Sequence, residues 1–469
     1  MATTTETQDG SGNDPEGPGA EESRAPGLLL VRALGGPAAE VVPLAGGSVE
    51  LGRAAPPFDR YPDSRISRHH ARVSLDGGHL VVTDLRSRNG MVVDGKALAQ
   101  GSSTRVSRAL RLGDSLLVPV PDVAVFRRLG VRVEAGRVEG PALQQVLLAA
   151  ASAATAGTTL HITGESGAGK EGVARAFHAA SSVASGPFEA VNCATIPDGV
   201  AERLLFGAKR GAYSGADADA DGYVQSADGG TLFLDEVAEL SLAVQAKLLR
   251  LLETGEVRAL GAARARRVKL RFCSATHRDL RAQVADGKLR EDLYFRVASP
   301  RVTVPPLRDR PEEIPWLVHA EVERVAPGLA AHVSLTEACL LRPWPGNVRE
   351  LCAEVRSAAQ AALLVGAARV EAKHLSETAG RSFSRQEEPA SVPPPARSTR
   401  ESRPVEREAR APSRATLVEL LRRCRGNVSA AARELGVHRT QLRRWMDRHG
   451  LDARSTAGPK RGPGRGGGE

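Results

Sequence analysis

A glycine-rich turn between an apolar strand and a helical segment constrains this chain more than any other feature. The turn consists of Gly164, Glu165, Ser166, Gly167, Ala168, Gly169 and Lys170. Residues 158–163 before it are β-branched and apolar, and residues 171–180 after it are compatible with a helix. In this setting backbone N–H groups and a helix N-terminus bind phosphate, and the lysine reaches the outer phosphates. The alternative is a glycine turn that holds no nucleotide.

A strand that ends in two carboxylates supports the nucleotide interpretation. The apolar residues 231–234 are followed by Asp235 and Glu236. Asp235 is expected to hold Mg²⁺, directly or through water, and Glu236 to polarise the water that attacks the terminal phosphate. Where a Ser or Thr after the lysine usually ligates Mg²⁺, this chain has Glu171. The two motifs together predict an ATPase that binds ATP and Mg²⁺.

Length and composition limit the remaining possibilities. The 469 residues are enough for about three domains. No apolar run reaches the ~18 residues of a membrane span, and residues 1–24 lack the apolar core of a signal peptide. The five cysteines are scattered without a C-x-x-C pair, which predicts reduced thiols and neither a disulfide framework nor a zinc site. We therefore expect a cytoplasmic protein that does not contact a membrane.

Residues 27–120 consist of short β-like runs separated by turns, without a helical period, so we expect an all-β sandwich. Polar clusters lie at residues 51–53, 67–72 and 84–90. Together they resemble the forkhead-associated (FHA) domain, a family that binds phosphothreonine peptides. Met91 departs from that family, which often has Thr after Asn-Gly; this should affect the fold more than the ligand.

The FHA resemblance implies a role for each polar residue. Arg53 and Ser67 would contact the phosphate, with Arg68 and Arg88 flanking it, Asn89 holding the peptide backbone and His70 bracing the loop. Guanidinium and hydroxyl donors that converge on a dianion form strong charge-assisted hydrogen bonds. The resemblance thus implies a phosphothreonine protein as partner, and a Ser/Thr protein kinase upstream. The alternative is a sandwich used only for docking.

Residues 136–380 alternate strands with helical stretches, which predicts a parallel α/β sheet with ligands at the strand C-termini. Several blocks resemble the AAA+ domain of bacterial enhancer-binding proteins, the activators of sigma-54 RNA polymerase. The blocks are residues 164–171, 191–194, 229–236, 245–250, 290–296, 305–310 and 344–351. In that family a Glu after the P-loop lysine is usual.

The AAA+ resemblance implies further site residues. Asn192 would switch Glu236 between idle and active orientations, Thr276 would sense the γ-phosphate, and Arg349 would be the sensor in a helical lid. Arg290 and Arg296 would reach into the neighbouring subunit's site. An arginine supplied in trans stabilises the transferring phosphoryl, so hydrolysis would require a homo-oligomer, from a dimer to a hexameric or heptameric ring. The alternative for both arginines is a solvated helix face.

Two departures from the AAA+ pattern concern the coupling of ATP hydrolysis to the contact with sigma-54. His277 stands where the family usually has Asn, which alters the hydrogen bonding of the sensing step. The segment Gly211, Ala212, Tyr213, Ser214, Gly215 and Ala216 resembles the family's sigma-54-contacting loop, normally Gly-Ala-Phe-Thr-Gly-Ala. Tyr213 keeps the aromatic face, whereas Ser214 lacks the methyl of Thr. The alternative is an ordinary surface loop that does not engage sigma-54.

The C-terminal part is basic and helical. Residues 413–469 contain 13 Arg or Lys against 5 Asp or Glu, nearly all of the net charge of +9. Helix, short Gly-containing turn and helix is the helix-turn-helix plan, and this segment resembles the Fis-type domain. The candidate DNA contacts are Arg439, Thr440, Gln441, Arg443 and Arg444, whereas Leu442 and Trp445 should pack inward. A structural helical hairpin is the alternative.

The expected architecture is multidomain: an all-β FHA sandwich, an α/β AAA+ P-loop ATPase with a helical lid, and an all-α helix-turn-helix. The expected segments are a disordered acidic tail (1–26), the FHA domain (27–120), the ATPase (136–380), a linker (381–412), the DNA-binding domain (413–452) and a basic tail (453–469).

The expected function is a transcriptional regulator that binds double-stranded DNA and remodels sigma-54 RNA polymerase by hydrolysing ATP, under phosphothreonine control. The rival is a DNA-binding regulator or repressor that uses ATP only to oligomerise. A phosphopeptide scaffold without ATP turnover is a third interpretation.

Overall fold

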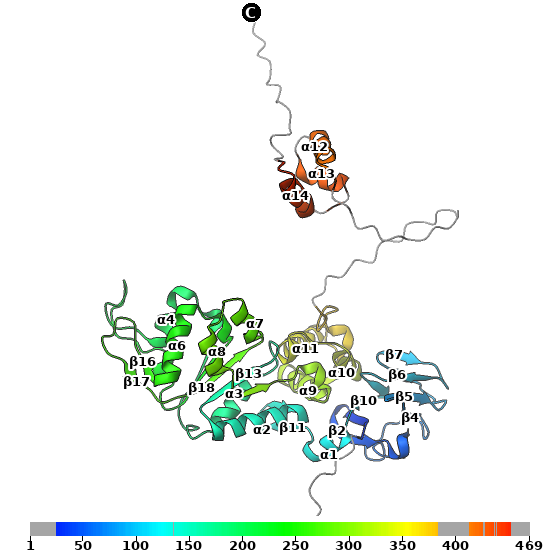
Figure 1. Cartoon of the computed structure of the whole chain (residues 1–469). Helices are drawn as coiled ribbons and strands as arrows, with labels where there is room; N and C mark the ends of the chain where they lie inside the picture. The colour runs from blue at the N-terminus through cyan, green and yellow to red at the C-terminus, as the bar shows by residue number, and fades with distance from the viewer. Residues whose placement is uncertain are drawn as a thin grey trace, which may run out of the picture. The chain divides into compact units, whose positions relative to one another are not determined.

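The chain folds into two units, and the computed structural model describes residues 25–134, 136–382, 412–424, 427–435, 437 and 439–451. Residues 25–382 belong to the first unit and residues 412–451 to the second (Figure 1). The expected acidic tail up to residue 24, most of the linker and the basic tail lie outside the described residues. Within the described part of the chain, no helix is both long and apolar enough to cross a membrane.

The N-terminal part of the first unit is the expected all-β sandwich. One sheet has the order β2-β1-β10-β9-β6-β7 and the other β3-β4-β5-β8. The alternating apolar residues of both sheets fill one core, which includes Leu28, Phe58 and Leu117. The strands are β1 Gly27–Ala33, β2 Gly36–Pro43, β3 Ser48–Leu51, β4 Ala71–Asp76, β5 His79–Asp84, β6 Met91–Val93, β7 Lys96–Leu98, β8 Ser103–Arg105, β9 Leu110–Leu112 and β10 Ser115–Val120.

The junction between sandwich and ATPase contains more regular structure than the sequence indicated. A short helix, α1 Val123–Leu129, begins after Asp122, whose side chain accepts a hydrogen bond from the Ala124 N–H. The hairpin of β11 Arg132–Glu134 and β12 Arg137–Glu139 follows. Helix α2 Pro141–Ala156 then starts with proline in its first turn, where the missing N–H is not needed.

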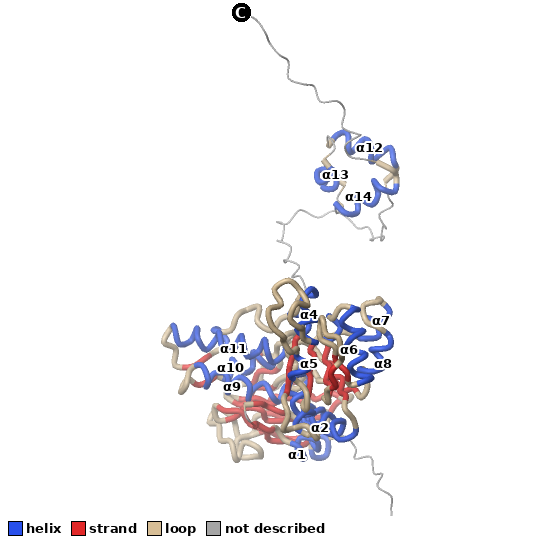
Figure 2. The backbone as a smooth tube through the Cα atoms, turned by 90° about the vertical axis from the view of Figure 1, so that its left-hand side faces the viewer, coloured by secondary structure: helices blue, strands red, loops and turns tan. Residues whose placement is uncertain are grey.

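The central part is the expected parallel α/β fold. All neighbouring strands of the sheet β14-β15-β18-β13-β19 run parallel. Helices flank this sheet, as the trace in Figure 2 shows. The strands are β13 Thr159–Thr163, β14 Phe188–Asn192, β15 Thr231–Asp235, β18 Arg271–Thr276 and β19 Arg301–Thr303, with a small hairpin of β16 Glu256–Val257 and β17 Arg266–Arg267. The helices are α3 Lys170–Ala179, α4 Asp198–Phe206, α5 Tyr223–Ser226, α6 Leu242–Thr254, α7 Leu280–Ala285 and α8 Glu291–Val297.

The lid, residues 305–382, is a helical subdomain that packs on the sandwich. It contains α9 Ile314–Val325, α10 Val333–Leu340 and α11 Asn347–Leu364, with β20 Ala330–Ala331 parallel to β21 Arg369–Val370. Its apolar core, centred on Trp344, is continuous with residues of β1 and β10. Figure 1 shows α9 and α10 beside β2 and β10. The sandwich and the lid therefore pack against each other through one continuous hydrophobic core.

Polar contacts surround this shared core. Arg108 Nη1 donates to the Leu341 carbonyl at 2.6 Å, and Arg111 forms a 3.1 Å ion pair with Glu337. Arg32 is 2% exposed and donates to the Ala331 carbonyl of the lid. Burial lowers the pKa of Arg32 to about 10, so the guanidinium stays charged at neutral pH.

The second unit consists of three helices, and the last two follow the expected helix-turn-helix plan. The three helices are α12 Arg414–Arg423, α13 Val428–Glu434 and α14 Arg439–Arg448. Ser413 caps α12 by accepting from the Thr416 N–H. The core of this unit contains Leu417, Leu420 and Leu421 of α12, together with Leu442 and Trp445. The inward packing expected for the last two residues is confirmed.

Candidate nucleotide site

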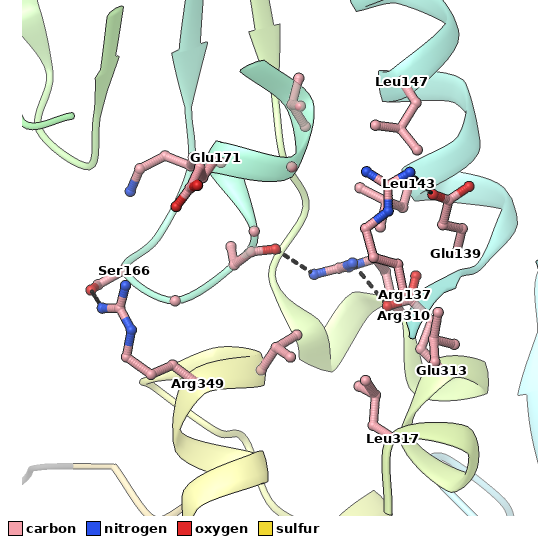
Figure 3. A pocket seen from close by; sticks show the side chains of 18 of the residues that line it. Arg137, Glu139, Leu143, Leu147, Ser166, Glu171, Arg310, Glu313, Leu317 and Arg349 are labelled. Atoms are coloured by element: carbon pink, nitrogen blue, oxygen red, sulfur yellow. Dashed lines mark hydrogen bonds and ion pairs between the residues drawn. The ribbon is translucent and has the colours of Figure 1, made fainter. Parts of the chain in front are cut away.

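The site lies at the carboxyl ends of the parallel strands, where ligands of open α/β sheets bind. Strand β13 leads into the phosphate-binding loop, residues 164–170, and β15 ends at Asp235 and Glu236. A cavity of about 520 Å³ opens between these segments, the hairpin β11–β12 and the lid. Leu143 and Leu147 of α2 face Leu317 of α9 across it and form an apolar wall with Val348 (Figure 3). The wall suits a flat base beside a phosphate cradle.

The phosphate-binding loop has the backbone that its glycines predict. Gly167 has a φ of 73°, and a Cβ there would lie 2.2 Å from the Gly346 carbonyl oxygen of the lid. Only glycine therefore fits this close approach. Helix α3 begins at Lys170, whose Nζ donates to the carbonyls of Gly164 and Glu165 at 3.0 and 3.3 Å. The lysine side chain is 7% exposed and faces the cavity.

Asp235 is the carboxylate that suits a metal ion. It lines the cavity, and burial raises its pKa. Mg²⁺ is commonly held by one or two carboxylates together with nucleotide phosphates, so Asp235 beside the phosphate-binding loop fits the ion. Glu171 is exposed and pairs with Arg175 at 2.7 Å. No cluster of three His, Cys, Asp or Glu side chains with metal-binding geometry occurs among the described residues.

Glu236 is held from the β18 side of the sheet. Its Oε1 lies 2.8 Å from His277 Nδ1 and 3.7 Å from Lys170 Nζ, and its Oε2 accepts from Thr276 Oγ1 at 3.2 Å. Its backbone is left-handed, with φ 55° and ψ 47°. Asn192, the predicted switch residue, lines the same cavity but caps the Ala194 N–H with its Oδ1 at 3.0 Å.

The lid reaches the phosphate-binding loop through Arg349, the predicted sensor, and through Asn347 and Arg308, for which the sequence predicted no role. Arg349 Nη1 donates to Ser166 Oγ at 3.3 Å (Figure 3). Asn347 is fully buried and donates to Glu165 Oε2 at 3.1 Å and to the Ser166 carbonyl at 3.0 Å. Arg308 donates two hydrogen bonds of 2.7 and 2.9 Å to the carboxylate of Glu165. Both residues lie in the sequence blocks 305–310 and 344–351 that resemble the AAA+ domain, and this resemblance is the signal in the sequence that pointed to them.

A buried ion pair also supports the loop. Arg310 and Glu313 are each 1% exposed and lie 2.9 Å apart. Arg310 Nη2 donates to the Ala168 carbonyl at 3.0 Å, and Glu313 Oε1 accepts from the Gly140 N–H at 2.8 Å. The pair therefore ties the phosphate-binding loop to the start of α2. Ala168 and Gly140 lie far from Arg310 and Glu313 in the sequence, so the spacing of residues along the chain did not predict these contacts.

The predicted arginine fingers do not line this cavity. Arg290 directly precedes α8, Arg296 lies in its last turn, and both are exposed. Arg290 pairs with Asp292 at 2.7 Å, and Arg296 Nη2 donates to the Leu252 carbonyl at 2.7 Å. Phe295 between them is 71% exposed. An exposed aromatic flanked by two cations is compatible with a surface that meets another subunit.

The predicted sigma-54 loop, residues 211–216, is part of the segment between α4 and α5. Its ends are closed by a hydrogen bond from the Gly211 N–H to the Ala216 carbonyl at 2.9 Å. Tyr213 stacks with Arg203, whose guanidinium carbon lies 5.2 Å from the ring centroid. Ser214 is exposed. The loop therefore presents an aromatic ring and a hydroxyl next to each other.

The predicted phosphopeptide residues converge at one end of the sandwich. Ser67 Oγ accepts from the Arg88 N–H at 3.0 Å, and Asn89 Nδ2 donates to the Arg65 carbonyl at 2.8 Å. Arg53, Arg68 and Arg88 are exposed. The bracing role expected for His70 agrees with its geometry: it is fully buried, accepts from the Ser67 N–H at 3.0 Å and contacts the Gly90 carbonyl at 3.1 Å.

The predicted DNA contacts belong to α14 of the second unit. Arg443 and Arg444 are exposed, on the side of the helix away from buried Leu442 and Trp445. Arg439, Thr440 and Gln441 form the start of the same helix. The helix thus separates an apolar inner face from a basic outer one, as a recognition helix requires.

Comparison with known proteins places all three parts. Residues 137–303 match the Sigma-54 interaction domain, residues 49–117 the FHA domain, and residues 413–449 the bacterial regulatory protein Fis family. The hydrogenase transcriptional regulatory protein HoxA of Cupriavidus necator is 39% identical over 67% of this chain and 65% of its own length. The response regulator protein FleR of Pseudomonas aeruginosa is 38% identical over 58% of this chain and 61% of its own length.

A solved structure, NtrX from Brucella abortus in complex with ATP, is 29% identical and covers 66% of this chain and 68% of its own, with a TM-score of 0.47. The chain spans less than two thirds of the length of the curated relatives HoxA and FleR. The chain thus combines an FHA domain, a sigma-54 interaction domain and a Fis-type DNA-binding domain, and the curated relatives that it resembles are transcriptional regulators.

Proposed function

We propose that this protein hydrolyses ATP to remodel the closed complex of sigma-54 RNA polymerase at promoters, while its C-terminal domain binds upstream DNA. The observation that carries the proposal is one domain that combines the phosphate-binding loop, the pair Asp235 and Glu236, and the exposed loop 211–216. The match of that domain to the sigma-54 interaction family supports the same activity.

The geometry supports a division of labour. Lys170 and the N-terminus of α3 would bind the phosphates, and the apolar wall of Leu143, Leu147 and Leu317 would hold the adenine. Mg²⁺ held by Asp235 would neutralise charge on the phosphates. Glu236 would polarise the attacking water. Arg290 and Arg296 of a neighbouring subunit would stabilise the transferring phosphoryl group, which makes turnover depend on a homo-oligomeric ring.

The FHA domain would control this activity by binding a phosphothreonine protein, and the sandwich–lid contact supplies a route. Asn89 holds the Arg65 carbonyl, and Arg65 Nη1 pairs with Asp114 Oδ1 at 2.6 Å. The charge of Asp114 acts on Arg32, which donates to the Ala331 carbonyl of the lid. A peptide that displaces Asn89 would thus change the contact between the sandwich and the lid. Arg349 of the lid reaches the nucleotide site, so the change would be passed on to that site.

The decisive experiment is promoter opening by purified protein at a sigma-54 promoter, with and without ATP, for wild type and Glu236→Gln. ATP-dependent opening that the variant loses supports the proposal. ATP turnover without opening by the wild type contradicts it. Lys170→Ala separates this function from a phosphopeptide scaffold, whose activity would not depend on nucleotide.

A second candidate is a DNA-binding regulator or repressor that uses ATP only to oligomerise. The bond between His277 and Glu236 favours it, because it engages the carboxylate that hydrolysis needs. Ser214→Ala distinguishes the two candidates. Under the activator proposal this variant keeps ATP turnover and loses promoter activation. Promoter activation that survives the change while ATP turnover is intact would contradict the sigma-54 contact.

A further inference from the structure

We infer that His277 restrains Glu236 and so acts as the positioning residue of the hydrolytic step, in the role that the AAA+ resemblance implies for Asn192. The inference rests on the proposed hydrolysis of ATP by Glu236 and concerns the control of that step. Its basis is the arrangement of the two residues at the ends of the adjacent strands β15 and β18.

Both carboxylate oxygens of Glu236 are hydrogen-bonded by the last residue of β18 and the residue after it. His277 Nδ1 contacts Oε1 at 2.8 Å, and Thr276 Oγ1 donates to Oε2 at 3.2 Å. The left-handed backbone of Glu236 fixes the direction in which its side chain leaves β15. A carboxylate that already accepts two hydrogen bonds is a weaker acceptor for a further donor. The carboxylate keeps free acceptor positions, but the bond to His277 holds Oε1 toward the end of β18, and its release would let Glu236 turn toward the attacking water.

Asn192 is used differently. Asn192 is exposed and ends β14, which pairs with the other side of β15. Its Oδ1 accepts a hydrogen bond from the Ala194 N–H at the start of the next turn. The short polar contact to the carboxylate comes from His277, whose ring nitrogen replaces the amide of the usual Asn. A δ nitrogen is available in both His and Asn, so the same geometry is open to both residues.

The loop that carries His277 is also tied to the helix of the predicted arginine fingers. His277 lines a cavity of about 360 Å³ together with Arg281 of α7 and Tyr294 of α8. Arg281 Nε donates to the Tyr294 hydroxyl at 2.9 Å. Because Arg290 directly precedes α8 and Arg296 lies in its last turn, a neighbouring subunit that engages these arginines acts on the segment that holds Glu236. Assembly of the ring is therefore expected to break the bond between His277 and Glu236.

The test is steady-state ATP turnover by the purified full chain and its variants. His277→Ala is expected to raise basal kcat about tenfold, the effect of removing one hydrogen bond to a charged group, with KM within about twofold. His277→Asn is expected to return kcat to the wild-type value because Asn keeps a donor at the δ position. His277→Gln, whose nitrogen lies one bond further out, is expected to resemble His277→Ala. The matched control is His319→Ala, at an exposed histidine of α9 outside the site.

Three results would overturn the inference. The first is a kcat of His277→Ala equal to or below that of wild type. The second is a His277→Gln variant that restores restraint as well as His277→Asn does. The third is a gain of turnover that persists when Glu236→Gln is added to His277→Ala, since the effect would then not act through Glu236. If Glu236→Gln alone keeps wild-type turnover, the proposed hydrolysis itself fails, and this outcome is distinct from the other three.

Discussion

Asn347 provides the sharpest test of how the lid holds the phosphate-binding loop. Its side chain is fully buried; its Oδ1 accepts from the Leu307 N–H at 2.8 Å, and its Nδ2 donates to Glu165 and to the Ser166 carbonyl. Its backbone φ is 52°, in the left-handed region that disfavours most side chains. Asn tolerates that region better than Ala does.

These contacts give the magnitude expected for Asn347→Ala. Loss of the hydrogen bond to the charged Glu165 and an unsatisfied Leu307 N–H together cost about 2–3 kcal/mol. Ala in a left-handed conformation adds about 1 kcal/mol. We therefore expect a loss of about 3–4 kcal/mol in the stability of the lid. Asn347→Gly lacks the same side chain without the backbone strain, so it should lose about 1 kcal/mol less.

The assay uses tryptophan fluorescence during urea unfolding. Trp316 and Trp344 belong to the lid, and Trp445 is the third tryptophan of the chain. In a Trp445→Phe background the signal therefore reports the lid alone. The KM for ATP should also rise, because Glu165 and Ser166 lose their anchor. A loss below about 1 kcal/mol, or equal losses for Asn347→Ala and Asn347→Gly, would refute the reasoning.

Three further predictions concern other parts of the chain. Burial raises the pKa of Glu312 to about 8, so its contribution to stability is full below the ordinary value of 4.5 and is lost as pH rises through 8. Glu312→Gln should therefore flatten the fall of the urea midpoint between about pH 5 and about pH 9. Ser67→Ala removes the hydroxyl that accepts from the Arg88 N–H and should weaken binding of a phosphothreonine peptide at least about tenfold by calorimetry. Glu337→Gln breaks the partly buried pair with Arg111 and should cost about 1–2 kcal/mol, with faster amide exchange in β10 and α10.

Much of the fold could be read from local patterns. Helix α2, the strand into the phosphate-binding loop, β15 and the three C-terminal helices each have a periodicity or a terminal signal within their own residues. The sandwich followed from short alternating runs between turns. The junction did not, because α1 and the β11–β12 hairpin have short segments with weak patterns and are stabilised by packing against α2 and by capping at Asp122.

The site divides in the same way. The sequence by itself determined the phosphate-binding loop, the pair Asp235 and Glu236, and the three domain families, because close spacing along the chain carries those motifs. Only the tertiary structure decided that Glu236 rests on His277, that Arg308 and Asn347 meet at Glu165, and that the sandwich shares a core with the lid. The physical reason is that these contacts join residues far apart in the chain. Their partners are selected by strand order and by helix packing, which act over the whole unit and leave no pattern within any one segment.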